Sequence, residues 1–443
     1  MRIDTLNIRN FKGFKELECS FHPEFNLIVG ENGTGKTALL DALSVAIGGW
    51  LLGLRGCQPR DIHLHEVRLE SLEQEIVDDD GEQRTAFNWE SQYPCEIEAT
   101  GEVLGQPVSW SRALKTPVGL TTYTEARQLH ELSGLSDKKV KSGETVLLPL
   151  ISYYGTGRVR DDQGDKAQVK GSEDFRGKEG LSRLEAYRDC LDGRVSVPGL
   201  MQWIRDQAWI TFDEGGHPPA GYLPVRDAMV RCIEGAKDIR YYRKVRQVIV
   251  ELENQLRHPF TNLSDGQRCM LAMVGDIAMK AATLNPHLGP KVLEETPGVV
   301  LIDELDLHLH PRWQRHVIED LRRTFPKIQF FAATHSPFLI QSLRSGEELM
   351  MLDGHPPAQV ANKPLQEIAR QIMKIAKPEV SARYEEMQEA ARHYLETLEE
   401  AEQTPEEKLA AFKEKLEESI ALYSDNPAFQ AFLEMKRAAK LGE

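Results

Sequence analysis

A glycine-rich segment near the start of the chain has the residue types that hold a chain of phosphates. Residues 30–37 read as a glycine, four residues and then Gly-Lys-Thr, the spacing of a phosphate-binding loop. An apolar run before the segment predicts a buried strand, and a helical pattern follows it. Glycines let the backbone N–H groups turn inward at the helix N-terminus, where they favour an anion. The residues predicted to bind a nucleotide here are Gly30, Asn32, Gly33, Thr34, Gly35, Lys36 and Thr37.

Two adjacent carboxylates follow a second apolar run. Residues 298–302 predict a buried strand, and Asp303 and Glu304 come directly after it. Acids in this position are costly unless they act at the carboxyl edge of a sheet. We expect Thr37 and Asp303 to hold Mg²⁺, and Glu304 to polarise an attacking water as general base. Alternatively, the two acids are solvated carboxylates of a turn.

A third apolar run, residues 328–333, ends at Thr334 and His335. A histidine beside the γ-phosphate of ATP can donate a hydrogen bond to the charge that develops in hydrolysis. We therefore predict a catalytic role for His335, although a lone histidine is also common as a structural residue.

The segment from Leu263 to Gln267 indicates the start of a helix. Ser264 suits the N-cap, and Gln267 is placed to complete a capping box. Such a helix N-terminus, with a close-approach glycine at Gly266, also suits a γ-phosphate. We therefore expect Ser264, Gly266 and Gln267 to contact nucleotide as well as to cap the helix.

These motifs, in this order, resemble those of ATP-binding-cassette ATPases of the RecF, SMC and Rad50 type. Residues 8–14 are similar to the opening strand of that group, which implies that Asn10 and Lys12 lie near the nucleotide. The resemblance implies an α/β fold: an ABC-ATPase head (P-loop NTPase, mixed sheet) with an inserted helical lobe and a helical C-terminal extension. It implies ATP and Mg²⁺ as substrate and cofactor.

By the same resemblance, residues 263–267 are the signature motif of the family, and Ser264 and Gly266 act on the site of a second copy. The chain would then form a head-to-head ATP-sandwich dimer, or a higher oligomer built from it. Residues 305–308 occupy the place of the D-loop at the dimer seam. Residues 151–158 occupy the place of the Q-loop without its glutamine, and there Tyr153 and Arg158 are candidates for sensing the nucleotide.

A closer resemblance is to the short ATPases of bacterial antiphage systems, the Septu (PtuA) and retron-associated ATPases. The residues that carry it are 153–158, the Leu-Asp-Leu-His-Leu-His-Pro run after Glu304, and residues 425–427 with Lys436 and Arg437. It implies a partner HNH nuclease from the same operon. Two alternatives are a RecF-like ATPase that holds DNA in repair, and an oligomeric scaffold that nucleotide only stabilises.

The net charge of −15 over 443 residues excludes a protein that coats nucleic acid along its whole surface. A DNA surface would have to be local, and residues 240–246 interleave basic and aromatic side chains. The alternative is an amphipathic helix whose long side chains cover the core. Residues 138–141 form a weaker basic cluster in a predicted loop.

The six cysteines show no zinc or Cys-x-x-Cys spacing, which fits a cytoplasmic protein. No stretch is expected to cross a membrane. His308 and His310 could suggest a metal, but the segment better fits a turn leading into a helix at Pro311.

Four regions follow from these patterns. Residues 1–158 are the first part of the ATPase lobe, with antiparallel strands between 96 and 114 and an exposed loop or hairpin tip at 71–90. Residues 159–258 are a mostly helical lobe that leads to the signature motif. Residues 259–355 complete the ATPase lobe. Residues 356–443 are a helical tail, either packed on its own ATPase lobe or docking a partner, with helices at 381–402, from 404 and around 429–435.

Overall fold

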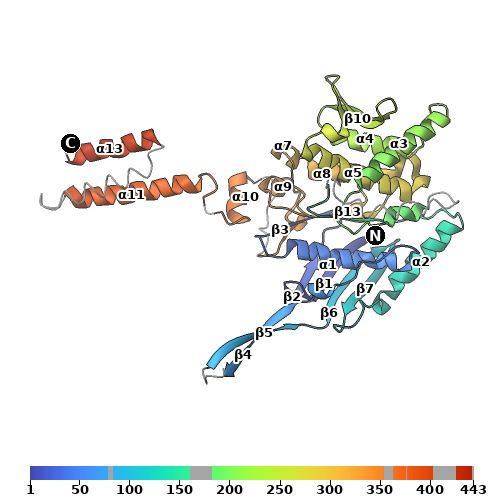
Figure 1. Cartoon of the computed structure of the whole chain (residues 1–443), viewed down its shortest axis with the longest axis horizontal. Helices are drawn as coiled ribbons and strands as arrows, with labels where there is room; N and C mark the ends of the chain where they lie inside the picture. The colour runs from blue at the N-terminus through green and yellow to red at the C-terminus, as the bar shows by residue number, and fades with distance from the viewer. Residues whose placement is uncertain (78–82, 160–181, 354–362, 376, 403–425, 442–443) are drawn as a thin grey trace. The chain divides into compact units, whose positions relative to one another are not determined.

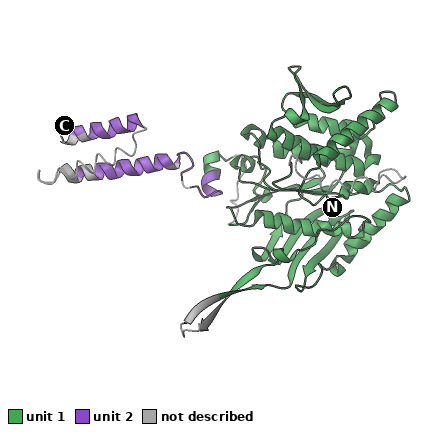
Figure 2. Ribbon diagram, viewed as in Figure 1, with its two compact units in different colours: residues 1–368 green, residues 369–443 purple. Residues whose placement is uncertain are grey.

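The computed structural model describes residues 1–77, 83–159, 182–353, 363–375, 377–402 and 426–441. The chain forms two compact units, residues 1–368 and residues 369–443 (Figure 2). The predicted tail begins earlier, at residue 356, than the second compact unit does. The three predicted regions before it all lie within the first unit.

A five-stranded parallel sheet is the centre of the first unit (Figure 1). Its order is β14 (Leu349–Met351), β3 (Phe25–Val29), β13 (Ile328–Ala333), β12 (Gly298–Ile302) and β8 (Leu150–Tyr154). Every residue of β3, β12 and β13 is buried, as expected for parallel strands with both faces covered. The three apolar runs that predicted strands before the candidate site residues are confirmed.

Helix α1 (Lys36–Gly48) lies between the parallel sheet and a four-stranded antiparallel sheet (Figure 1). That second sheet has the order β2 (Phe14–Ser20), β1 (Arg2–Phe11), β6 (Cys95–Val103) and β7 (Gln106–Leu114). Trp110 on β7 donates a 2.9 Å hydrogen bond from its ring nitrogen to the Ala46 carbonyl of α1. The predicted antiparallel strands between residues 96 and 114 are therefore confirmed.

Because α1 is covered on both sides, it is unusually apolar. The stretch Lys36–Gly53 has the length and composition of a membrane span, and 78% of it is buried inside the protein. Length and composition alone therefore do not indicate a membrane span here. The reason is burial between two sheets, which selects the same side chains as a bilayer does.

An antiparallel pair, β4 (Leu69–Val77) and β5 (Gln83–Ser91), extends from the antiparallel-sheet side of the unit (Figure 1). The predicted hairpin is thus present, and its tip lies outside the described residues. Helix α2 (Arg127–Lys141) follows β7. Lys138, Lys139 and Lys141 lie in its last turn, so their predicted loop was wrong; cations in that place favour a helix because they face its negative end.

On the opposite side of the parallel sheet from α1 lie helices α3 (Val197–Asp213), α4 (Tyr222–Arg231) and α5 (Asp265–Leu284) (Figure 1). Helix α5 is held to β8 by buried polar contacts. The Tyr154 hydroxyl donates to Asp276 at 2.8 Å, and the Lys280 ammonium donates to the Ser152 hydroxyl at 3.0 Å. The signature helix is therefore fixed to the edge strand of the sheet.

The last part of the predicted helical lobe is a small sheet instead. Strands β9 (Ala236–Tyr242), β10 (Gln247–Leu252) and β11 (Arg257–Pro259) pair antiparallel in the order β11-β10-β9. The amphipathic-helix interpretation of residues 240–246 was therefore wrong. Buried Ile239 pairs with Val250, and Tyr241 pairs with Val248, and this alternation of β-branched and aromatic residues favours strands.

Short helices complete the first unit, and a helical pair forms most of the second. The short ones are α6 (Val292–Glu295), α7 (Pro311–Gln314), α8 (Val317–Thr324) and α9 (Pro337–Gln341), with α10 (Leu365–Gln371) at the junction. In the second unit, α11 (Ala382–Glu402) packs against α13 (Pro427–Leu441) through Tyr394 and Leu433. These two helices confirm the predicted helices at 381–402 and 429–435; the one predicted from residue 404 lies outside the described residues.

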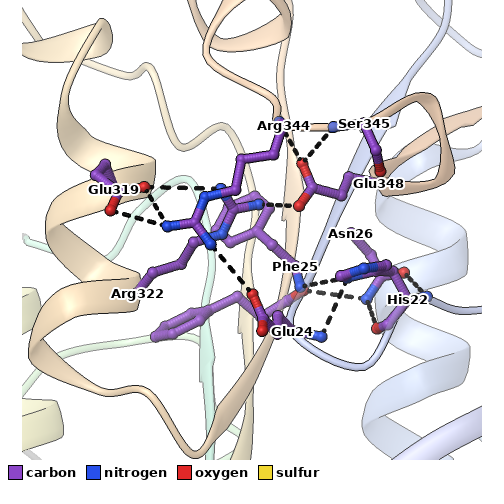
Figure 3. A network of polar contacts seen from close by, with 10 residues as sticks. His22, Glu24, Phe25, Asn26, Glu319, Arg322, Arg344, Ser345 and Glu348 are labelled. Atoms are coloured by element: carbon purple, nitrogen blue, oxygen red, sulfur yellow. Dashed lines mark hydrogen bonds and ion pairs between the residues drawn. The ribbon is translucent and has the colours of Figure 1, made fainter. Parts of the chain in front are cut away.

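A polar network anchors the start of β3 (Figure 3). The Arg322 guanidinium pairs with the buried Glu348 carboxylate and lies 5.3 Å from the centre of the Phe25 ring. The backbone N–H of Arg344 donates to the same carboxylate at 2.7 Å, and its guanidinium donates to Glu319 at 2.9 Å. These contacts fix the position of the first residue of β3. The strand ends at the glycine-rich loop.

Candidate active site

The loop between β3 and α1 has the backbone geometry of a phosphate-binding loop. Gly33 and Gly35 have φ angles of 85° and 102°, which a residue with a Cβ adopts only under strain. A Cβ at Gly35 would also lie 2.6 Å from the ring of Phe14. Gly35 is the N-cap of α1, so the free N–H groups of the first turn face the loop and favour an anion there.

Lys36 is folded back over this loop. Its ammonium donates to the carbonyl oxygens of Gly30 and Glu31 at 2.7 and 2.9 Å. Burial lowers the pKa of the Lys36 amine, and the nearby Asp303 carboxylate opposes this effect. Within the described ranges the ammonium has no carboxylate within ion-pair distance, and the negative phosphates of a nucleotide would supply the missing counter-charge.

The other predicted loop residues lie where the sequence places them. Asn32 and Gly33 are exposed on the loop. The Thr34 hydroxyl donates to the Glu31 carbonyl at 2.9 Å and so closes the turn. A Cβ at Gly30 would lie 2.5 Å from that hydroxyl oxygen, which explains a glycine as the first residue of the loop.

The hydroxyl of Thr37 and the carboxylate of Asp303 meet across the sheet edge. The Thr37 hydroxyl donates to Asp303 at 2.8 Å. Asp303 is only 3% exposed, and burial raises the pKa of its carboxyl, while the Thr37 hydrogen bond acts in the opposite direction. A hydroxyl oxygen and a carboxylate oxygen side by side are the hard ligands that Mg²⁺ takes in nucleotide sites, so this pair fits the predicted ion.

Glu304 stands at a sharp turn after β12. Its φ angle is 47°, a left-handed backbone that is uncommon for residues other than glycine. The Arg158 guanidinium donates to the carbonyl oxygens of Asp303 and Glu304 at 2.6 and 2.8 Å. In the described part of the chain the Glu304 carboxylate has no hydrogen bond or ion pair, so it can accept one from water. Unusual backbone held in place by its surroundings is frequent at functional sites.

The end of β13 is tied to the segment after Glu304. The Thr334 hydroxyl hydrogen-bonds the Asp306 carboxylate, and it accepts the Ser336 N–H at 2.9 Å. His335 lies between these two fixed residues and is half-buried. Its backbone is therefore held while its imidazole has no hydrogen bond or ion pair within the described residues.

The strand order brings these groups together. Strands β3, β13 and β12 are neighbours and parallel, so their carboxyl ends meet at one edge of the sheet. That edge carries the phosphate loop, His335 and the Asp303–Glu304 pair. Residues separated by nearly 300 positions in the sequence thus form one candidate site.

The signature segment forms a separate surface. Ser264 caps α5 by accepting the Gln267 N–H, and the Gln267 side chain accepts the Ser264 N–H at 3.1 Å, as predicted for a capping box. A Cβ at Gly266 would lie 2.3 Å from the His308 carbonyl oxygen. Asp265 and His308 also line one pocket of about 250 Å³. The signature segment and the D-loop, residues 305–308, of one chain therefore lie side by side. Among the described residues, no hydrogen bond or ion pair joins residues 263–267 to the phosphate loop.

Asn10 and Lys12 are engaged with protein groups. The Asn10 amide donates to the Pro94 carbonyl at 3.0 Å. The Lys12 ammonium pairs with Asp41 and lies 3.5 Å from Glu66. Their predicted contact with nucleotide stays a prediction. Sequence reasoning missed Asp41, although a carboxylate inside the apolar helix α1 is the kind of signal that marks a buried polar partner.

The side chains of Tyr153 and Arg158 also interact with other residues of the chain. Burial, followed by the charges of Asp41 and Asp303, raises the pKa of the Tyr153 phenol. Arg158 is 2% exposed, and besides the two carbonyls its Nε atom lies 3.1 Å from the Cys269 sulfur on α5. Arg158 therefore links the carboxylate turn to the signature helix, a positioning role that the sequence did not reveal.

The histidines of the D-loop region have a local role. His310 accepts the Arg312 N–H at 3.2 Å and caps α7, which confirms the predicted helix start at Pro311. No group of three or more histidine, cysteine or acidic side chains suited to a metal occurs among the described residues. The six cysteines are all free thiols.

Two domain families match the chain. One, described as an AAA domain, matches residues 5–202. The other, described as an AAA domain, putative AbiEii toxin, Type IV TA system, matches residues 160–341. Between them they extend from the opening strand through the phosphate loop, the signature and the carboxylates to the end of the β13 edge.

Several curated proteins are similar to it. The retron Ec83 probable ATPase of Escherichia coli is 24% identical over 80% of this chain and 72% of its own length. The Septu protein PtuA of Bacillus thuringiensis is 28% identical over 78% of this chain and 74% of its own. The RecF protein of Idiomarina loihiensis is 49% identical, but over only 10% of this chain and 12% of its own.

Among solved structures, an Smc head bound to the winged-helix domain of ScpA is similar, with a TM-score of 0.44 and 15% identity over 79% of this chain and 94% of that one. The α/β fold with its phosphate loop rests instead on the parallel sheet and the two domain matches. On these matches the chain carries AAA-type domains between residues 5 and 341, and over most of its length it is similar to the retron probable ATPase and to the Septu protein PtuA.

Proposed function

We propose that this protein binds and hydrolyses ATP, and that the nucleotide state of its dimer regulates a partner nuclease in antiphage defence. The observation that carries the hydrolytic part is the meeting of Lys36, the Thr37–Asp303 pair, Glu304 and His335 at one sheet edge. Each has the chemistry that one part of the reaction needs.

The reaction uses these residues in sequence. Lys36 exchanges its two backbone carbonyls for the β- and γ-phosphates of ATP. Thr37 and Asp303 would hold Mg²⁺, which supplies positive charge to the phosphates. Glu304 accepts a hydrogen bond from the attacking water and takes its proton as the P–O bond forms. His335 donates a hydrogen bond to the γ-phosphate oxygen as the bond to ADP breaks, so ATP and water give ADP, phosphate and a proton.

The site is completed by a second copy in this proposal. No hydrogen bond or ion pair joins the signature segment to its own phosphate loop among the described residues, and exposed Ser264 stands at the N-terminus of the 20-residue helix α5. That N-terminus favours a γ-phosphate. ATP would then join two heads and hydrolysis would release them, because only the triphosphate contacts both.

The test of hydrolysis is Glu304→Gln, which keeps the size of the side chain and removes its basicity. Turnover of Mg-ATP is expected to fall about a hundredfold, while ATP-bound dimers or larger oligomers accumulate in light scattering after size exclusion. The matched control is Glu294→Gln, an exposed carboxylate outside the site, which should leave both readouts unchanged. Unchanged turnover in Glu304→Gln would remove Glu304 as the base; accumulation without any wild-type turnover would favour the nucleotide-stabilised scaffold.

The regulatory part rests on the similarity to the retron and Septu proteins. We place the complex in the cytoplasm, in keeping with six free thiols, and expect an HNH nuclease from the same operon as partner. The tagged protein, purified from its operon with and without Mg-ATP, should bring this nuclease with it and cut plasmid DNA in a nucleotide-dependent way. A protein that elutes alone, cuts nothing and hydrolyses ATP faster with DNA would favour the RecF-like alternative.

A further inference from the structure

The turn between β9 and β10 carries positive charge that the described residues do not neutralise. Tyr242 pairs with Gln247 across the hairpin, so Arg243, Lys244 and Arg246 all lie in the turn. Over the described residues, none of these three cations has a carboxylate within ion-pair distance. By contrast, Arg240 on the adjoining strand pairs with Asp238 at 3.1 Å and Glu251 at 3.5 Å. In a chain of net charge −15, three unpaired cations within four residues are a local exception.

Exposed aromatic rings on α3 lie directly beneath this turn. The Arg243 guanidinium lies 3.8 Å from the ring centre of Phe212 and 4.9 Å from that of Trp209. Phe212 is 58% exposed and Trp209 45% exposed, although burying such rings is strongly favourable. Stacking fixes the guanidinium plane of Arg243 and leaves its N–H edge free to donate to an anion.

A groove that includes Arg246 of this turn lies along the first half of α3. It has a volume of about 500 Å³ and lies between α3 and β10. Arg205 and Arg246 are among its lining residues, together with the amides of Gln202 and Gln247 and the ring of Tyr241. Its floor is apolar, with Met201 and Phe260 among the contributors. An apolar floor with aromatic, amide and arginine side chains offers both stacking and hydrogen bonds to a flat polar ring.

We propose that this surface, formed by α3, the 243–246 turn and the groove between α3 and β10, binds single-stranded nucleic acid. Bases would stack on Tyr241 and the apolar floor, and the phosphates would contact Arg243, Lys244 and Arg246. This division of stacking and backbone contacts is general for single-strand binding. A duplex keeps its bases in the helical stack and cannot place them in the groove, and three cations give little affinity for phosphates alone.

The inference does not depend on the proposed ATPase mechanism, because the surface lies outside the candidate active site. Binding is therefore measured with the full-length, nucleotide-free protein, by fluorescence anisotropy of a labelled oligothymidine of about 20 nucleotides. The affinity should fall with rising salt with a log–log slope of about −2, as about three phosphate contacts to a single strand predict.

The charge variant is Arg243→Ala/Lys244→Ala/Arg246→Ala. It should weaken binding at least about tenfold and flatten the salt slope. The matched control removes the same number of positive charges from the end of α2, as Lys138→Ala/Lys139→Ala/Lys141→Ala, and should stay within about twofold of wild type. A second variant, Tyr241→Ala, should weaken binding without changing the salt slope, because it removes stacking and no charge.

Other outcomes overturn the proposal. Equal losses in the two triple variants would mean that only net charge matters. Tighter binding of a duplex of the same length, or equally effective competition by polyglutamate, would assign the surface to a duplex or to an acidic protein segment. No binding by the wild type at protein concentrations of about 50 μM would exclude a nucleic-acid role, since even non-specific affinities are typically of that order. Thermal melting of each variant shows whether the fold is kept.

Discussion

Buried charge is compensated by protein groups at one end of strand β3 and lacks such compensation at the other end. At its start, the Arg322 guanidinium and the Glu348 carboxylate are 7% and 2% exposed and pair directly with each other (Figure 3). The same carboxylate also accepts backbone N–H bonds from Arg344 at 2.7 Å and Ser345 at 3.4 Å. The two charges here compensate each other inside the protein, although the Nε and Nη1 atoms of Arg322 are buried without a hydrogen-bond partner among the described residues.

At the other end, five residues later, charge lacks compensation. Among the residues that the structure describes, buried Lys36 has only two backbone carbonyls as acceptors, and buried Asp303 accepts a hydrogen bond from the Thr37 hydroxyl. Burial lowers the pKa of the lysine and raises the pKa of the aspartic acid, so both ionised forms are disfavoured. The difference indicates that the first end serves stability, and that the second keeps groups ready for a charged ligand.

The largest effect is expected at the compensated end. Replacing Glu348 with alanine leaves the Arg322 guanidinium buried without its partner, which typically costs about 3–5 kcal/mol. Chemical denaturation should show this loss in the free energy of unfolding. Where the variant remains folded, the KM for ATP should be unchanged, because the network lies away from the phosphate loop.

Two controls sharpen this prediction. Glu347→Ala removes an exposed neighbouring carboxylate and should change stability by less than about 0.5 kcal/mol. The double change Arg322→Met/Glu348→Leu removes both charges and should recover much of the loss. If Glu348→Ala were as stable as wild type, the pair would not anchor β3.

The next effect is expected at the uncompensated end. Lys36→Met removes the cation that the phosphates need, so ATP turnover should fall about a hundredfold or more, equivalent to about 2.7 kcal/mol of transition-state stabilisation. Nucleotide-free stability should hold or rise, because a poorly compensated buried charge is lost. Steady-state ATPase assays and thermal melting measure the two quantities.

Lys15→Met is the matched control for this change, since Lys15 is an exposed lysine on β2. It should alter neither turnover nor melting temperature. A large loss of nucleotide-free stability in Lys36→Met would contradict the comparison, because it would show that Lys36 stabilises the fold as Arg322 does.

A smaller effect is expected where the site is coupled to the signature helix. Arg158→Gln should lower turnover about tenfold, since the guanidinium no longer holds the left-handed turn at Glu304. ATP binding, measured by calorimetry, should be nearly unchanged. If Arg158 acts through Glu304, adding Arg158→Gln to Glu304→Gln should cause little further loss; fully additive losses would show an independent role.

The sequence predicted the groups at this sheet edge because their signals are local. Apolar runs ending in Gly-rich or acidic segments mark β3 and β12, and Ser264 with Gln267 marks the start of α5 within four residues. The phosphate loop follows from the same kind of short pattern. Nothing beyond neighbouring residues is needed for these predictions.

The contacts that distinguish the two ends of β3 are not local. Arg158 binds carbonyls 145 and 146 positions further along the chain, and Arg322 on α8 pairs with Glu348, which lies 26 positions further along and directly precedes β14. The helix interpretation of residues 240–246 was wrong for another reason. The basic and aromatic residues of this segment fit one face of a helix and a strand equally well. The pairing of β9 with β10 determines that the segment forms a strand. Tertiary contacts, rather than composition, set these features.

The smallest effect is on pH dependence. Because burial raises the pKa of Asp303 in the folded protein, the folded state holds this proton more tightly than the unfolded state. The protein therefore loses stability as the pH rises above the ordinary pKa of aspartic acid. The loss is complete once the pH exceeds the raised pKa of Asp303 in the folded state. Asp303→Asn removes the loss, so at neutral pH the nucleotide-free variant should melt on the order of 1–2 °C higher than wild type.

Below the ordinary aspartate pKa the two proteins should melt alike, since Asp303 is then protonated in both states. Exposed Asp213→Asn is the control and should follow wild type at every pH. Mg-ATP should stabilise the wild type and not Asp303→Asn, because ligand that binds only the folded state raises its stability. An Asp303→Asn protein that melts lower than wild type at neutral pH would place this carboxylate with the stabilising charges at the start of β3, and the contrast between the two ends would fail.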